Sequence, residues 1–341
     1  MKNKFLNLTV LIVTSAIMVY FFIFLNGLEN LIMQMRNMKI QWIIIAVITF
    51  IFFWIFETLV LYYISSSLYN KKIKILSYFR YVLIGQFFGA ITPFSSGSQP
   101  SQVLAMNEDG IPAGIAASIL AIKFILHEIV YFIFLIVSLI FKFNYFNVRI
   151  KFFLQFCIIG LIINAIVISM AMLVAFTIKI PKKIMILIYK FLNYIRLLKN
   201  YEEKCVKLDE ELLSFHNHAK LMWKYKYSCI AAGIFTAAQW FAYYIIPYFI
   251  YRSFSMNYIS IFTMITAQVF LTMFMSCIPI PGAEGGAEAG FYIIYRLFFT
   301  KNNLVPAIFI WRIVTYYFTI LTGGVFTVFI SKKQRKVKIS D

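Results

Sequence analysis

Long apolar runs separated by short polar stretches recur along the whole chain. Six of these runs are long, at roughly 5–26, 42–64, 113–141, 152–178, 227–251 and 304–330. An α-helix needs about 20 predominantly apolar residues to cross the hydrocarbon layer of a bilayer. The pattern therefore predicts six membrane-spanning helices.

Two further apolar segments, roughly 79–106 and 258–299, are interrupted by proline and glycine. Pro93 and Gly97 interrupt the first, and Pro281 and Gly285 interrupt the second, with both pairs 188 positions apart. Proline removes a backbone donor and glycine adopts dihedrals that other residues avoid, so each segment should form two half-helices. The predicted fold class is all-α and polytopic, with about six full spans plus two broken re-entrant hairpins. Two ordinary interhelical turns are the alternative.

Lysine and arginine fall mainly on one side of these predicted spans. Four segments hold 22 of them, namely the residues before the first span, those after the second span, positions 179–226 and the C-terminal tail. The opposite-side segments hold only seven. The positive-inside rule then predicts a multi-pass protein of the cell membrane with both termini in the cytoplasm. The two hairpins would enter from opposite sides, as an inverted repeat.

Composition excludes an ordinary soluble protein, because 62% of the 341 residues are hydrophobic and only 13% are charged. We expect a single integral membrane domain over 1–341. The net charge is +19, and the basic residues that produce it lie mostly between the predicted spans. This placement favours anionic phospholipids as the partner rather than directly bound nucleic acid. The basic segment at about 179–226 is predicted to be a cytoplasmic amphipathic linker along the membrane interface, with a solvated charged linker as the alternative for 200–218.

Ionisable side chains inside spans are costly, so they are candidates for function. The third span contains Lys123, His127 and Glu128, and Arg312 lies one position from the place equivalent to Lys123 in the sixth span. A cation in each half suits an anionic lipid head group. The alternative is a cation that reaches the interface or pairs with a carboxylate such as Glu57 in the second span.

The breaks themselves offer further candidates. Glu284 and Glu288 flank Gly285 and Gly286 at the second break, where Glu288 could instead cap its own half-helix. The first break supplies hydroxyl and amide groups without charge, including Ser98 and Gln99. Exposed backbone N–H groups at such breaks can bind phosphate. Neither metal-ligand spacing nor a nucleotide-binding motif is present, so we expect no metal, no cofactor and no catalytic residue.

Two stretches resemble the signatures of the flippase-like membrane proteins, the family that includes the membrane domain of lysylphosphatidylglycerol synthases and multiple peptide resistance factors. They are Gly85 to Pro100 and Pro279 to Phe291. Ser98 stands where the family commonly has a second glycine. Members of that family are implicated in moving aminoacylated or glycosylated lipids between leaflets and in resistance to cationic peptides.

The resemblance implies a lipid flippase that translocates a polar or aminoacylated phospholipid, such as lysyl-phosphatidylglycerol. The alternative is the membrane component of a phosphatidylglycerol lysyltransferase that acts with a separate aminoacyl-transferase subunit, since no such catalytic domain lies on this chain. A third alternative is a membrane scaffold that transports nothing. The sequence leaves open whether the protein forms a homo-oligomer.

Overall fold

The structure is a computed structural model that describes residues 33, 35–176, 182–183, 185–187, 189–190, 208 and 225–327. Every regular element in this part of the chain is helical. The elements are α3 (Ile40–Leu68), α4 (Ile75–Ala90), η1 (Pro93–Ser95), α5 (Ser98–Glu108), α6 (Ala113–Asn147), α7 (Phe153–Phe176), α10 (Lys226–Tyr244), α11 (Ile246–Ser253), α12 (Ile261–Ser276), η2 (Pro281–Ala283), α13 (Gly286–Tyr295), α14 (Lys301–Arg312), η3 (Ile313–Tyr317) and α15 (Phe318–Val325).

Five helices in the described residues are long and apolar enough to cross a membrane, and they correspond to five of the six predicted spans. The all-α polytopic membrane fold is therefore confirmed. The predicted first span at 5–26, most of the linker at 179–226 and the basic tail lie outside the described residues.

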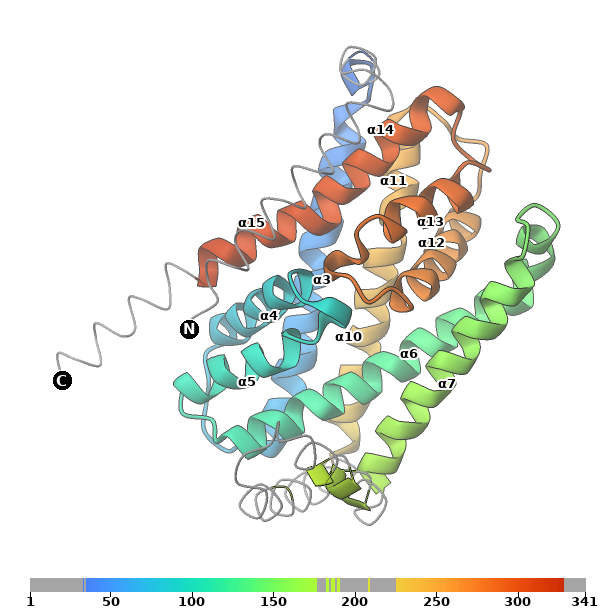
Figure 1. The fold of residues 1–341 in the computed structure, drawn as a ribbon. Helices are drawn as coiled ribbons and strands as arrows, with labels where there is room; N and C mark the ends of the chain where they lie inside the picture. The colour runs from blue at the N-terminus through green and yellow to red at the C-terminus, as the bar shows by residue number, and fades with distance from the viewer. Residues whose placement is uncertain are drawn as a thin grey trace.

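The chain is built from two similar halves of opposite direction. A shift of 188 positions carries η1 (Pro93–Ser95) onto η2 (Pro281–Ala283), and it carries the starts of α5 and α6 onto those of α13 and α14. The hairpin of α4 and α5 enters from one end of the bundle and the hairpin of α12 and α13 from the other (Figure 1). Their two breaks contact each other in the middle of the molecule. The helices therefore form the inverted pair of broken hairpins that the sequence predicted.

Both long helices of the second half contain proline. The fifth predicted span is divided at Ile245 into α10 and α11, because Pro247 lies in the first turn of α11 and has no N–H to donate. Pro306 lies inside α14, and the same helix then continues through a π-helical turn, η3, into α15. This π turn carries Tyr316, which lies at the junction of the breaks.

The first turn of the backbone, in η1 and η2, has nearly the same shape at the two breaks. In η1, Phe94 and Ser95 have positive φ values of 51° and 54°. In η2, the equivalent Gly282 and Ala283 have φ values of 60° and 51°. Two successive left-handed residues reverse the chain sharply, which allows each hairpin to turn at membrane depth. The first half makes this turn without glycine at either position.

Gly97 serves close packing rather than a positive φ. Its φ is −78°, in the right-handed region, and its N–H donates to Thr92 Oγ1 at 2.8 Å. A Cβ added at Gly97 would lie only 2.8 Å from the Thr92 side chain. Gly285, at the equivalent position, instead has a φ of 77° and open space around it. The two glycines share a position but are needed for different reasons.

Ser98 fits where Gly286 stands in the other half because the facing residue is small. A Cβ at Gly286 would lie 2.1 Å from Ile278. The first half has Ala90 at the position equivalent to Ile278, so the Ser98 side chain has room and α5 begins there normally. The departure from a glycine pair therefore leaves the break intact.

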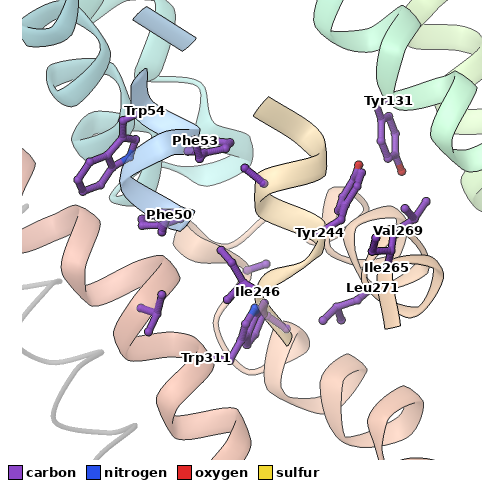
Figure 2. Packing of buried hydrophobic residues seen from close by; sticks show 14 of the residues in the cluster. Phe50, Phe53, Trp54, Tyr131, Tyr244, Ile246, Ile265, Val269, Leu271 and Trp311 are labelled. Atoms are coloured by element: carbon purple, nitrogen blue, oxygen red, sulfur yellow. The ribbon is translucent and has the colours of Figure 1, made fainter. Parts of the chain in front are cut away.

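Aromatic side chains fill much of the space between the halves. Trp54 packs on Phe50 with ring centroids 5.0 Å apart and on Phe318 at 5.3 Å. Trp311 is fully buried against Phe291, with centroids 5.1 Å apart. Figure 2 shows Trp54 near Phe50 on α3 and Trp311 close to Ile246 at the start of α11. This packing holds α3, α13 and α14 around the junction of the breaks.

Gly282→Ala should destabilise the protein more than Gly285→Ala does. Both positions have a positive φ, which is unfavourable for an L-residue and costs about 1–2 kcal/mol in the left-handed region where Gly282 lies. At Gly282 the added Cβ would also lie 2.3 Å from the Tyr316 ring, whereas Gly285 has nothing within 4 Å. Thermal unfolding in detergent checks the difference between the two variants. Equal melting temperatures would contradict the tight contact between Tyr316 and the second break.

Candidate functional site

Lys123 on α6 is paired with Glu57 on α3. The Lys123 Nζ lies 2.5 Å from Glu57 Oε1 and also donates to Gln102 Oε1 at 3.2 Å. The side chains of Lys123 and Glu57 are only 13% and 4% exposed. A pair this buried is favourable only when its remaining lone pairs and protons are also satisfied. The structure therefore contains the ion pair between Lys123 and Glu57 that the sequence analysis gave as the alternative to a free cation.

Two glutamines complete the shell around Glu57. Gln86 on α4 donates to Glu57 Oε2 at 2.6 Å, and Gln239 on α10 donates to the same oxygen at 3.3 Å. Sequence reasoning assigned no role to either one. The available signal was an amide side chain within the apolar part of each helix, since hydrocarbon alone does not favour a buried amide.

Gln102 joins the first broken hairpin to this cluster and keeps one donor free. It is fully buried, and its Nε2 has no hydrogen-bond partner among the described residues. Gly85 on α4 makes room for it, because a Cβ there would lie 2.0 Å from that Nε2. A buried donor without a partner costs free energy, so this amide is available to a ligand oxygen.

Arg312 forms the second ion pair, with Glu288 on α13. Its Nε donates to Glu288 Oε1 at 2.5 Å, and its Nη1 donates to the Gly282 carbonyl at 3.0 Å. In the part of the chain that the structure describes, Arg312 Nη2 and Glu288 Oε2 have no hydrogen-bond partner. Glu288 lies in the first turn of α13 but makes no side-chain cap there. Arg312 thus ties the last helix to the second break and keeps a spare donor.

The two cations do not share one cluster. No hydrogen bond or ion pair among the described residues links Lys123 directly to Arg312. Helix α10 lies between them, since Gln239 reaches Glu57 and Tyr243, one turn later, lies within electrostatic reach of Arg312. Lys123 and Arg312 therefore stand at nearly equivalent positions of the repeat along the chain, but they belong to two separate ion pairs.

Tyr316 lies where the two breaks meet. Its hydroxyl donates to the Ala90 carbonyl at the end of α4 at 3.3 Å, and its ring covers Gly282. Glu284 lies beside the same hydroxyl. Pro93 and Gln99 are exposed at the first break, whereas Pro281 and Gly286 are half-buried at the second. The two breaks therefore form an asymmetric junction that is more open on the η1 side.

His127 and Glu128 do not join the Lys123 pair. The His127 ring packs on Trp240 with centroids 4.4 Å apart, and Trp240 Nε1 donates to the His127 carbonyl at 3.2 Å. Glu128 has no hydrogen-bond or ion-pair partner among the described residues. It lies toward Tyr131 and Tyr244, on another face of α6.

A third ion pair, which sequence reasoning missed, closes the outer end of the first hairpin. Arg80 Nη2 lies 2.9 Å from Asp109 Oδ2, and Tyr81 donates to that same oxygen at 2.6 Å. Arg80 is one of the cations that the positive-inside count placed after the second span. In the structure it lies inside α4 and is only 5% exposed. Within the described residues, no group of histidine, cysteine, aspartate and glutamate side chains could hold a metal ion.

A family model agrees with this architecture. The model described as the lysylphosphatidylglycerol synthase TM region matches residues 8–323, which include both breaks and every ion pair described above. No curated protein sequence matches the chain. The extent of the family match, together with the paired broken hairpins, means that this chain belongs to the family of the lysylphosphatidylglycerol synthase transmembrane region.

Proposed function

We propose that the protein is a lipid flippase that moves a polar or aminoacylated phospholipid between leaflets. The observation that carries the proposal is the contact, in the middle of the helix bundle, between the breaks of two hairpins that enter from opposite ends. Irregular backbone within a bilayer is tolerated where it is buried in protein or lines a cavity, and paired broken helices are typical of transporter binding sites.

The groups around this junction suit a phospholipid head group. Arg312 Nη2 and Gln102 Nε2 are donors without partners among the described residues, and Glu288 Oε2 is an acceptor without one. Phosphate needs donors, and an ammonium group on the same lipid needs an acceptor. The membrane family adds a link to lysyl-phosphatidylglycerol, which makes that lipid and phosphatidylglycerol the first substrates to test.

Reconstitution in liposomes tests the proposal. Vesicles that contain the protein should exchange labelled lysyl-phosphatidylglycerol or phosphatidylglycerol between leaflets faster than empty vesicles and faster than vesicles with the Glu57→Gln/Lys123→Gln variant. Exchange at the empty-vesicle rate for both lipids would refute the flippase proposal.

The family description also favours a second function, as the membrane component of a lysyltransferase with a separate catalytic subunit. In that case a host that expresses this chain beside such a subunit would make more lysyl-phosphatidylglycerol in total. A flippase would change only its distribution between leaflets, so a measurement of both quantities separates the two functions.

The proposed orientation places both termini in the cytoplasm of a cell-membrane protein. Asn70 is exposed just after the end of α3, and Asn144 is exposed near the end of α6. These two helix ends lie at opposite ends of the bundle (Figure 1). In a variant with its native cysteines replaced by serine, Asn144→Cys should react with an impermeant reagent from outside, and Asn70→Cys only after permeabilisation. Outside labelling at Asn70 would reverse the orientation.

A further inference from the structure

Glu128 is a carboxyl group inside α6 that no cation accompanies. Lys123 is on the same helix, but residues five apart point about 140° away from each other around the axis, and Glu57 already pairs with Lys123. Lys142 lies near the far end of α6. Among the described residues, the spare carboxyl therefore has no positive charge in its own helix to neutralise it.

The helices packed against α6 add no cation beside it either. Helices α7 and α12 carry no charged residue within their bounds, α3 carries only Glu57, and α5 carries only Glu108 as its last residue. The only charged residue of α10 is Lys226, its first. Among the described residues, the titratable groups that interact with Glu128 are Tyr131, one turn later on α6, and Tyr244 at the end of α10. Cys277, just after α12, lies beside Tyr131. An ionised carboxylate in such surroundings is costly, whereas a protonated one is not.

The tyrosines beside Glu128 carry unused hydroxyl groups. Tyr131 and Tyr244 are 4% and 0% exposed, and neither hydroxyl has a hydrogen-bond partner in the described residues. Both lie within electrostatic reach of Glu128, and Figure 2 shows their hydroxyl ends coming together between α6 and α10. Asn164 on α7 is the polar side chain beside the Tyr131 hydroxyl, and its amide also donates to the Gly160 carbonyl at 2.8 Å.

Trp240 packs against this group of side chains. Its ring lies 5.4 Å from that of Tyr131 and 5.0 Å from that of Tyr244, and its other neighbour is His127. Buried hydroxyls without partners, fixed beside a carboxyl, can accept a hydrogen bond from its neutral form and donate one to its ionised form. Such a group can stabilise the carboxyl in both protonation states in turn.

We propose that Glu128, with the hydroxyls of Tyr131 and Tyr244, forms a proton-binding site whose protonation is coupled to lipid movement. The carboxylate takes up one proton from water and returns it to water, and no other bond is made or broken. The coupling rests on the proposed flippase function, while the proton site itself does not. Half-buried Glu128 is accessible enough for this exchange.

Infrared difference spectroscopy during a pH titration tests the proton site without transport. The wild-type protein should show the carbonyl band of a protonated carboxylic acid that disappears as the pH rises. Glu128→Gln should abolish this band, Glu128→Asp should keep a shifted one, and Glu108→Gln, at an exposed position, should leave it unchanged. Retention of the whole band in folded Glu128→Gln would overturn the proposal.

Liposome transport at several pH values tests the coupling. The wild-type transport rate should change with pH. In Glu128→Gln the change in rate across the same pH range should be at least threefold smaller, whereas Glu108→Gln should show the wild-type change. Identical profiles for Glu128→Gln and wild type would overturn the coupling. If wild-type vesicles move no lipid at all, the flippase proposal fails, and the infrared result then decides the proton site alone.

Discussion

Replacing Lys123 by glutamine should both destabilise the protein and stop lipid movement. The substitution leaves Glu57 as a buried carboxylate held only by the amides of Gln86 and Gln239. Removing one partner of a buried ion pair costs about 3–5 kcal/mol, since the other charge remains unpaired. We expect a marked fall in the melting temperature in detergent and transport at least tenfold slower.

The double variant Glu57→Gln/Lys123→Gln separates stability from function. It removes both charges, so most of the lost stability should return, because a buried polar pair without charge is often no less stable than the ion pair. Transport should remain impaired if the pair opens to bind a head group. Wild-type transport by the stable double variant would make the pair purely structural. Lys142→Gln, near the end of the same helix, is the matched control and should alter neither property.

Replacing Arg312 by lysine should slow transport about 10- to 100-fold. The guanidinium group satisfies Glu288 through Nε and the Gly282 carbonyl through Nη1, and it keeps Nη2 for a ligand. An ammonium group is a point charge and cannot reproduce this planar arrangement. The half-buried Gly282 carbonyl at the second break would lose its partner, at a cost of up to about 1–3 kcal/mol.

The control for this change is Arg296→Lys, at an exposed position just after α13. It makes the same chemical substitution next to the same half-helix and should leave transport and melting temperature unchanged. Liposome exchange rates and thermal unfolding measure both variants. An Arg312→Lys protein that transports at the wild-type rate would exclude a need for the guanidinium group, and for its spare Nη2 donor, at this position.

The architecture could be predicted from local patterns, and the interior of the site only in part. Apolar run lengths predicted the spans, and the repeated proline and glycine spacing predicted both breaks, because each signal depends on neighbours along the chain. Glu57 meets residues from α4, α6 and α10, and such convergence depends on how separate helices pack. A sequence pattern identified the carboxylate but not its amide partners.

Arg80 and Gly97 show why chemically correct residue types can still mislead. Arg80 resembles a loop cation by position, but Asp109, contributed from just after α5, allows it to be buried. Gly97 suggests an unusual dihedral, but the backbone there is ordinary and the side chain of Thr92 is what excludes a larger residue. Asp109 and Thr92, the neighbours that explain these two residues, both lie where the chain turns between helices. The spacing of apolar residues does not predict the detailed geometry of such turns.

The short half-helices have a consequence for how far a charged group must travel. Helix α5 has 11 residues and α13 has 10, so at a rise of about 1.5 Å each covers roughly half of the ~30 Å hydrocarbon layer. Their tips meet, so polar backbone is present at mid-depth where lipid alone would offer none. A head group that reaches this point from either face would cross two thin barriers in sequence instead of one thick barrier, and its acyl chains could stay in the surrounding bilayer throughout.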